Sequence, residues 1–212
     1  MFKKRHATEF RYAQIAEAAL DIVRRRGVGG LSVAAVAAEV DIVPSAVYRH
    51  YKNKSEIVTA VLDLIHARLN ANYQAVIQQH LAPLDKLKSL LQQHVDLIKA
   101  NSAIPRIIFS GEVIGGEPEK RQQLYGIIQD VIHNVAMIVE EGQHQELIRR
   151  DIPPRNIALS FLGIFQPATI IWSLSGGEFD LLQHCENAWK LFLDAIRVPP
   201  DDTVKTRLWR GQ

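Results

Sequence analysis

The feature that most constrains this chain is the spacing of its apolar residues, which return every three or four positions almost from end to end. Between Thr8 and Arg26, for example, Ile15, Ala19 and Ile22 fall on one face of a helix. No segment of useful length alternates apolar and polar residues as a half-buried strand does. The sequence therefore predicts an all-α fold with about nine helices.

Glycine and proline residues interrupt this pattern and set the expected helix ends. Gly27 follows the first helical segment as a stop signal, and Pro44 suits the first turn of a later helix. The expected helices span residues 8–26, 33–40, 44–51, 54–80, 84–99, 103–113, 119–145, 155–174 and 178–197.

Two of these segments, 33–40 and 44–51, are short and are joined by a turn of about three residues. Ser32 is a good N-cap for the first of them, and the longer first helix can pack across both. This arrangement is a helix-turn-helix, whose second helix enters the major groove of DNA. The sequence therefore predicts a DNA-binding unit near the N-terminus.

Charge is distributed unevenly along the chain. Residues 1–54 carry ten Lys and Arg against five Asp and Glu, whereas the remaining residues carry 15 against 18. A basic head on a mildly acidic body favours a polyanionic partner for the head alone. We therefore expect a DNA-binding head at residues 1–54, a helical effector-binding and dimerisation body at residues 55–198, and a polar tail at residues 199–212.

The outer face of the second short helix carries residue types that read DNA. Tyr48 and Arg49 could meet base edges, while Lys52 and Lys54, just past the helix, could hold the phosphate backbone. The candidate DNA-binding residues are Ser32, Pro44, Ser45, Tyr48, Arg49, His50, Lys52 and Lys54.

Several of these residues also have an ordinary structural interpretation. Tyr48 and Tyr51 could both be core aromatics, but we expect Tyr48 on DNA and Tyr51 buried. His50 could turn inward instead of outward. The run Arg24-Arg25-Arg26 could bind phosphate or simply complement the C-terminal dipole of the first helix.

The segment Ile15-Ala16-Glu17-Ala18-Ala19-Leu20, then Gly27, Ser32-Val33 and the run Val47-Tyr48-Arg49-His50-Tyr51-Lys52-Asn53-Lys54, resembles the N-terminal domain of tetracycline-repressor (TetR/AcrR) family regulators. The resemblance covers roughly residues 10–62. It implies a ligand-responsive transcriptional regulator, most simply a repressor, that binds a palindromic operator as a homodimer. It also implies release by a small apolar or amphipathic effector, and a phosphate contact from Lys54.

Two positions depart from the family pattern. Asp41 stands in the turn where members usually have Gly, and Val43 stands where they have a capping Ser. Asp tolerates the left-handed backbone that such a turn glycine adopts. Val43 has no side chain for capping, but Pro44 removes one of the N–H groups that would need a partner. We therefore expect the fold to survive without the family's phosphate contact from the cap serine.

The last two long helices, 155–174 and 178–197, are expected to form a four-helix bundle with a second copy of the chain. The first of them carries apolar residues on more than one face, which is more than a core-facing stripe requires. Gly163 and Ala168 would allow close helix approach.

The middle helices could enclose an apolar ligand, and the family resemblance implies that such a pocket exists. We sought polar-tipped side chains within apolar helices, together with phenylalanines that could form a wall. For each of them a core or surface role is an open alternative. The candidate ligand-binding residues are Tyr73, His94, Phe109, Tyr125, Phe161 and Trp172.

An all-α enzyme and a helical protein-interaction adaptor are the alternative functions. The histidines are scattered, and no nucleophile motif, P-loop or metal-ligand pair is found, so we expect no enzyme activity, cofactor or metal. The single cysteine, Cys185, excludes an internal disulfide and fits a cytoplasmic protein. The most apolar stretch, 157–174, contains polar residues and is expected to be a core helix rather than a membrane span.

Overall fold

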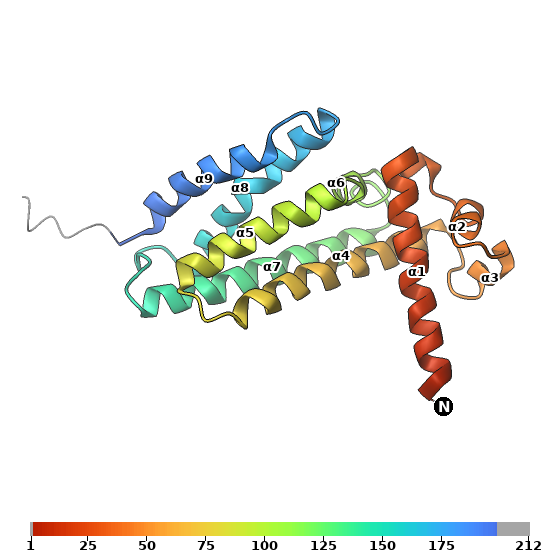
Figure 1. Cartoon of the computed structure of the whole chain (residues 1–212), viewed down its shortest axis with the longest axis horizontal. Helices are drawn as coiled ribbons and strands as arrows, with labels where there is room; N and C mark the ends of the chain where they lie inside the picture. Colours follow the sequence, from red (N-terminus) through yellow and green to blue (C-terminus); the bar gives the residue numbers. More distant parts are fainter. Residues whose placement is uncertain (1, 199–212) are drawn as a thin grey trace, which may run out of the picture.

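The chain forms an elongated bundle of helices with a smaller three-helix head at one end (Figure 1). The computed structural model describes the backbone of residues 2–198 and the side chains of residues 11–198. Within this range it contains nine α-helices and a short 3-10 turn, so the predicted all-α fold is confirmed. The helices are α1 (Phe2–Arg26), α2 (Val33–Glu39), α3 (Pro44–Tyr48), α4 (Lys54–Ile77), α5 (Pro83–Ala100), α6 (Ala103–Ile108), α7 (Pro118–His144), α8 (Pro154–Leu174) and α9 (Leu181–Ile196).

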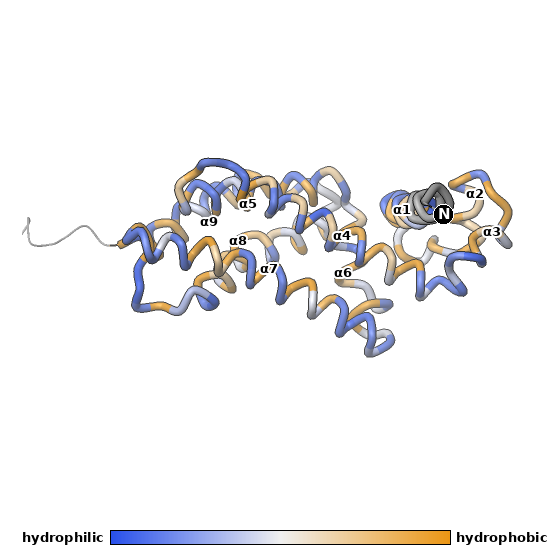
Figure 2. Tube along the Cα trace, turned by 90° about the horizontal axis from the view of Figure 1, so that it is seen from below, coloured by the Kyte–Doolittle hydropathy of each residue, from blue (hydrophilic) through white to orange (hydrophobic). Residues whose placement is uncertain are grey.

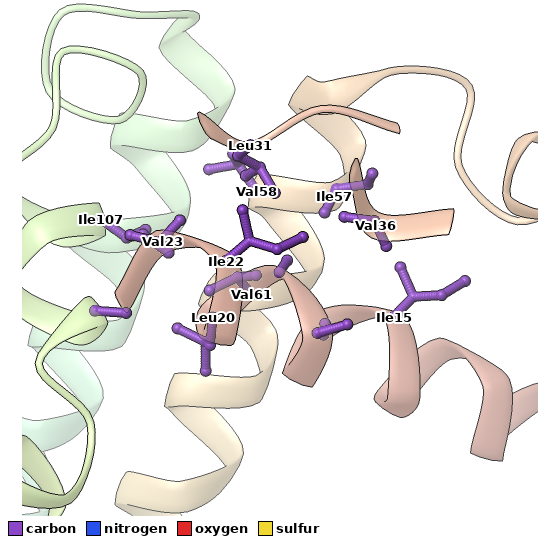
Figure 3. Close-up of a cluster of buried hydrophobic side chains, with 14 of the residues drawn as sticks. Ile15, Leu20, Ile22, Val23, Leu31, Val36, Ile57, Val58, Val61 and Ile107 are labelled. Carbon is purple, nitrogen blue, oxygen red and sulfur yellow. The ribbon is translucent and has the colours of Figure 1, made fainter. Parts of the chain in front are cut away.

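The head consists of α1, α2 and α3, with α1 lying across the end of the body helices (Figure 1). Its core is a cluster of aliphatic side chains from α1 and α2, closed by the first turns of α4 (Figure 3). Ile107 of α6 also enters this cluster, beside Val23 of α1. The head core is therefore completed by residues that belong to the body.

The body is built from α4, α5, α7, α8 and α9, which enclose a second apolar core. Along these helices hydrophobic and hydrophilic residues recur in turn (Figure 2), and buried apolar side chains of each helix pack in the second core. The helix α4 contributes to both cores, with Ile57 and Val61 in the first and Val76 in the second. It thus connects the two cores, as does α7, which has Ile127 in the first core and Ile132 in the second. The domain division after residue 54 stays a prediction.

Several helices are shorter than the sequence predicts. α3 ends at Tyr48 rather than near residue 51, and α6 ends at Ile108 rather than at residue 113. Asn53 is extended and caps α4, where its side chain accepts a hydrogen bond from the N–H of Glu56 at 2.9 Å, so α3 and α4 cannot form one continuous helix. The predicted polar tail, 199–212, lies outside the described residues.

Within residues 2–198, α8 is the one helix that is long and apolar enough to cross a membrane by length and composition. A core helix passes the same test. Phe161, Ile164 and Phe165 of α8 are buried in the second core, as expected for a core helix.

The turn between α2 and α3 has the backbone that the sequence predicts. Asp41 has a φ of 52°, in the left-handed region. Val43 precedes α3 in extended conformation without a side-chain capping hydrogen bond, and Pro44 occupies the first turn. Asp41 therefore adopts the left-handed backbone expected at this position of the turn.

We expect Asp41→Val to lower the free energy of unfolding by about 1–2 kcal/mol, because a β-branched side chain is strained at positive φ. Asp41→Gly should leave stability nearly unchanged. Chemical denaturation of the full chain measures both, with Asp194→Val, at an exposed helical position of α9, as the control. Equal stability of the two Asp41 variants would contradict the role assigned to the turn.

Candidate functional site

The outer surface of α3 is open to solvent. Pro44, Ser45 and Arg49 are exposed, and 54% of Tyr48 is accessible, whereas Val47 is fully buried. A five-residue helix turns its one buried residue to the core and leaves the others facing outward. The structure thus groups these four predicted DNA-binding residues on one exposed surface.

Tyr51 anchors the end of α3 to α1. It is buried, its ring packs edge-on against Tyr12 at 5.1 Å, and its hydroxyl donates to the backbone carbonyl oxygen of Tyr12 at 3.4 Å. Burial raises the pKa of the Tyr51 phenol, so it remains protonated. His50 is half-buried and also packs edge-on against Tyr12, at 5.0 Å, so its ring is turned partly inward.

Ser32 is exposed at the start of α2, where its hydroxyl oxygen accepts a hydrogen bond from the N–H of Ala35 at 3.1 Å. The predicted N-cap is therefore present. Because the hydroxyl acts here as an acceptor, its own proton is left to donate to another group, such as a phosphate oxygen.

The two lysines after α3 are in different environments. The side chain of Lys52 is 86% exposed and only loosely paired with Glu56, at 4.0 Å. Lys54 instead forms a close ion pair with Glu112, with 2.7 Å between Nζ and Oε1. Glu112 lies in the loop between α6 and α7, so the ammonium group that the sequence assigns to phosphate is held by a carboxylate of the body.

A second carboxylate of the same loop also contacts the start of α4. Ser55 donates a hydrogen bond to Glu117 at 2.6 Å, and the ammonium group of Lys120 donates to the same oxygen at 2.6 Å. The hydrogen bond from Lys120 is the largest cause of a lowered pKa for Glu117. The start of α4, where the chain leaves the head, is thus attached to the loop between α6 and α7 at two points.

Arginines at the end of α1 are engaged within the head. Arg24 pairs with Asp21 at 3.0 Å, and Arg25 forms an ion pair with Glu39 of α2. Arg106 of α6 in turn donates to the backbone oxygen of Arg24 at 3.2 Å, which satisfies a carbonyl at the C-terminal end of α1.

The body contains an apolar cavity of about 290 Å³. Its wall is formed by side chains of α4 to α8 together with Phe109 and Ile114 from the loop after α6. Phe109 and Ile114 are 44% and 51% exposed, so the cavity reaches the surface beside them. None of the lining residues carries a formal charge at neutral pH; the polar ones are His94, Gln166 and Thr169.

His94 of α5 is the most deeply buried polar group of this wall, with 2% of its surface exposed. Its ring lies edge-on to Phe165 at 5.4 Å, and its Nδ1 atom has no hydrogen-bond partner among the described residues. Burial lowers the pKa of the imidazole to about 4, because the charged form is poorly solvated there. The ring is therefore neutral at pH 7.

The structure brings two of the six predicted ligand-binding residues, His94 and Phe109, to the cavity wall. The other four do not line it. Phe161 is buried in the second core, Tyr73 and Trp172 are partly buried against it, and Tyr125 is 56% exposed on α7. Their assignment as ligand contacts has no geometric support in this cavity and stays a prediction.

Sequence reasoning missed much of the cavity wall and the partner of Lys54. Ile104, Pro105 and Ile108 come from the short apolar helix α6, and its apolar run was the available signal. Glu112 gave no signal, because it is separated from Lys54 by 58 positions in the sequence.

Comparisons with known proteins agree with this geometry. Residues 15–61 match the bacterial regulatory proteins of the tetR family, and residues 66–195 match the C-terminal region of YsiA-like proteins. The chain is 19% identical to the fatty acid metabolism regulator protein of Bacillus subtilis, covering 88% of this chain and 95% of that one. It is 25% identical to the HTH-type transcriptional regulator TtgR of Pseudomonas putida, covering 93% and 96%. The crystal structure of FadR from Bacillus subtilis in complex with stearoyl-CoA superimposes with a TM-score of 0.75 at 18% identity, covering 88% and 100%.

The pairing of Lys54 with Glu112 generates a prediction for DNA binding. We expect Lys54→Ala to weaken binding to all DNA sequences and to reduce the salt dependence of binding by about one phosphate contact. Glu112→Gln should tighten binding by up to about fivefold, because it releases the ammonium group from a partly exposed ion pair. Fluorescence anisotropy with labelled duplexes at several salt concentrations measures both effects.

Glu119→Gln is the matched control, since it removes one negative charge from an exposed residue in the first turn of α7. If Glu112→Gln and Glu119→Gln bound DNA equally, the ion pair would not restrain Lys54.

Proposed function

Since the chain belongs to the TetR family of bacterial regulatory proteins and is thus a ligand-responsive DNA-binding transcriptional regulator, we propose that it is a repressor that binds a palindromic operator as a homodimer. An apolar or amphipathic effector in the cavity between α4 and α8 would release it from DNA. The observation that carries this proposal is the segment 107–114, because it contacts both the head and the cavity.

Some residues of this segment contact the head, and others line the cavity. Ile107 packs in the head core beside Val23, and Glu112 pairs with Lys54 at the exit of the head. Phe109 and Ile114, at intervening positions, line the cavity. A ligand that displaces these two side chains therefore acts on a segment whose other residues hold the head.

The exposed surface of α8 supports a dimer through α8 and α9. Leu159, Gly163, Ile170 and Leu174 are exposed and recur at spacings of four and seven, which places them along one face of the helix. A side chain added at Gly163 would meet nothing within 4 Å, so this face is open. Ala168, in contrast, is buried in the chain's own core and cannot contact a partner.

The exposed apolar residues of α8 and α9 together form a surface that a four-helix bundle would bury. Leu174 is 83% exposed and Leu159 is 60% exposed, and on α9 Leu191 is 75% exposed. Apolar residues at such exposure on two adjacent, packed helices are typical of a contact surface. A dimer also supplies the two reading heads that a palindromic operator requires.

The effector class is supported by the relatives and by the cavity wall. The homologous FadR was solved with stearoyl-CoA, a molecule with a long apolar chain. The wall described above is almost wholly apolar and could surround an apolar chain or ring system. The coenzyme portion of that ligand does not suit this cavity, because its phosphate groups would find no cation in the wall.

For the dimer, we expect Leu174→Glu and Leu159→Glu to produce monomers in sedimentation velocity, because each places a charge in the apolar contact. Both should lose operator binding, since a single head makes too few contacts. Met137→Glu, at a 47% exposed position of α7, is the control and should remain dimeric. Dimers of unchanged affinity in both leucine variants would exclude this interface.

For the switch, we expect Leu124→Trp to lower operator affinity by about tenfold, because a larger side chain in the cavity wall mimics an occupied cavity. Tyr125→Trp is the matched control, since the next residue along α7 is exposed and does not line the cavity. Binding is measured by anisotropy on a genomic fragment selected by the wild-type protein. A folded, dimeric Leu124→Trp variant that binds like wild type would show that the cavity does not control DNA binding.

A further inference from the structure

The cavity wall contains one buried polar side chain with an unpaired ring nitrogen. His94 lines the wall and is 98% buried, and its Nδ1 atom has no partner among the described residues. Buried polar groups in proteins are nearly always paired, because an unmet hydrogen bond destabilises the folded chain. Because the His94 ring lines the cavity, a ligand bound there can supply a hydrogen-bond partner to the imidazole.

The other two polar groups of the wall are either already hydrogen-bonded or less deeply buried. The Thr169 hydroxyl donates its proton to the backbone oxygen of Phe165 at 2.7 Å and so can only accept from a ligand. Gln166 is half-buried on the same helix. His94 comes from α5 and is the most deeply buried of the three.

The chemistry of the wall also limits the charge of the ligand. No lysine, arginine, aspartate or glutamate lines the cavity, so a buried carboxylate, phosphate or ammonium group would have no counter-ion. The neutral imidazole offers one N–H donor and one acceptor nitrogen but no charge. A hydroxyl group can meet either nitrogen, and a carbonyl oxygen can meet the N–H.

We propose that His94 is the hydrogen-bonding anchor of the effector site, and that the site takes an uncharged, largely apolar molecule bearing one hydroxyl or carbonyl oxygen. This inference rests on the proposed function, in which the cavity is the effector site. It goes further by naming the anchoring residue and the class of ligand, and by excluding from the cavity any charged end of an amphipathic effector.

Four probes with one carbon skeleton test the ligand class: naphthalene, 2-naphthol, 2-acetylnaphthalene and 2-naphthoate. Their affinities for the full-length protein at pH 7 are measured by titration calorimetry. We expect 2-naphthol and 2-acetylnaphthalene to bind about tenfold more tightly than naphthalene, since each pairs the buried nitrogen of His94. Binding of 2-naphthoate should be at least tenfold weaker than that of 2-naphthol. The ring ¹⁵N resonances of His94 in the wild-type protein should shift with 2-naphthol and not with naphthalene.

Two variants test the residue. In His94→Phe the preference for 2-naphthol over naphthalene should fall to about one, while naphthalene still binds. His94→Gln should keep part of the preference, because the amide can donate and accept. His133→Gln is the matched control, since His133 is exposed on α7 and outside the cavity wall, and it should keep the full preference.

Several outcomes would overturn the inference. These are an undiminished preference in His94→Phe, tighter binding of 2-naphthoate than of 2-naphthol, unshifted His94 resonances, or no binding of any uncharged probe. Failure of the proposed function is read separately, from operator release. Probes that bind through His94 but leave DNA affinity unchanged would support the anchor while contradicting the switch.

Discussion

The first helix of the head is packed on two sides, and the placement of the reading surface depends on this packing. Side chains of α1 such as Ile22 and Val23 meet Val61 of α4 and Ile107 of α6 in one apolar cluster (Figure 3). Burial of several such aliphatic side chains is worth about 1.5–3 kcal/mol each. The head therefore cannot be displaced from α4 and α6 without exposing its own core. Its orientation is set by the body.

Hydrogen bonds and ion pairs around this cluster also join the head to the body. Arg106 reaches the backbone of Arg24, Arg68 pairs with Glu17, and Lys54 pairs with Glu112. Partly exposed ion pairs of this kind stabilise by about 1 kcal/mol or less, so the apolar cluster supplies most of the energy. The ion pairs instead fix which side chains of the head and the body lie next to one another. Small forces on the loop between α6 and α7 can change them without unfolding the head.

The two faces of α8 are in different environments, one inside the chain's own body and one exposed. Phe165 and Thr169 point to the cavity wall and the core, whereas Leu159 and Leu174 are exposed along the opposite side. The side chains that line an empty apolar cavity lack the dispersion contacts of a filled core, and a ligand of matching shape can provide these contacts. If α8 also joins the partner subunit, a change at its inner face is adjacent to the dimer contact. The same helix would then bear on both ligand binding and the spacing of the two heads.

The sequence by itself determined the features that depend on near neighbours. Helical periodicity gave the all-α fold, Ser32 marked the start of α2, and Asp41 adopts the left-handed turn predicted for it. Tyr51 is buried and Tyr48 is exposed, as expected for the two tyrosines of this segment. Each of these follows from backbone geometry over a few residues, which local residue types fix.

Only the tertiary structure decided which distant residues meet. It paired Lys54 with Glu112, and it placed His94 in the cavity wall while leaving Phe161 in the core and Tyr125 on the surface. The pattern of a helix tells which face is apolar, but a cavity is the space left where five helices pack imperfectly. Its position depends on the crossing angles and side-chain volumes of all of them together, and no local pattern contains that information.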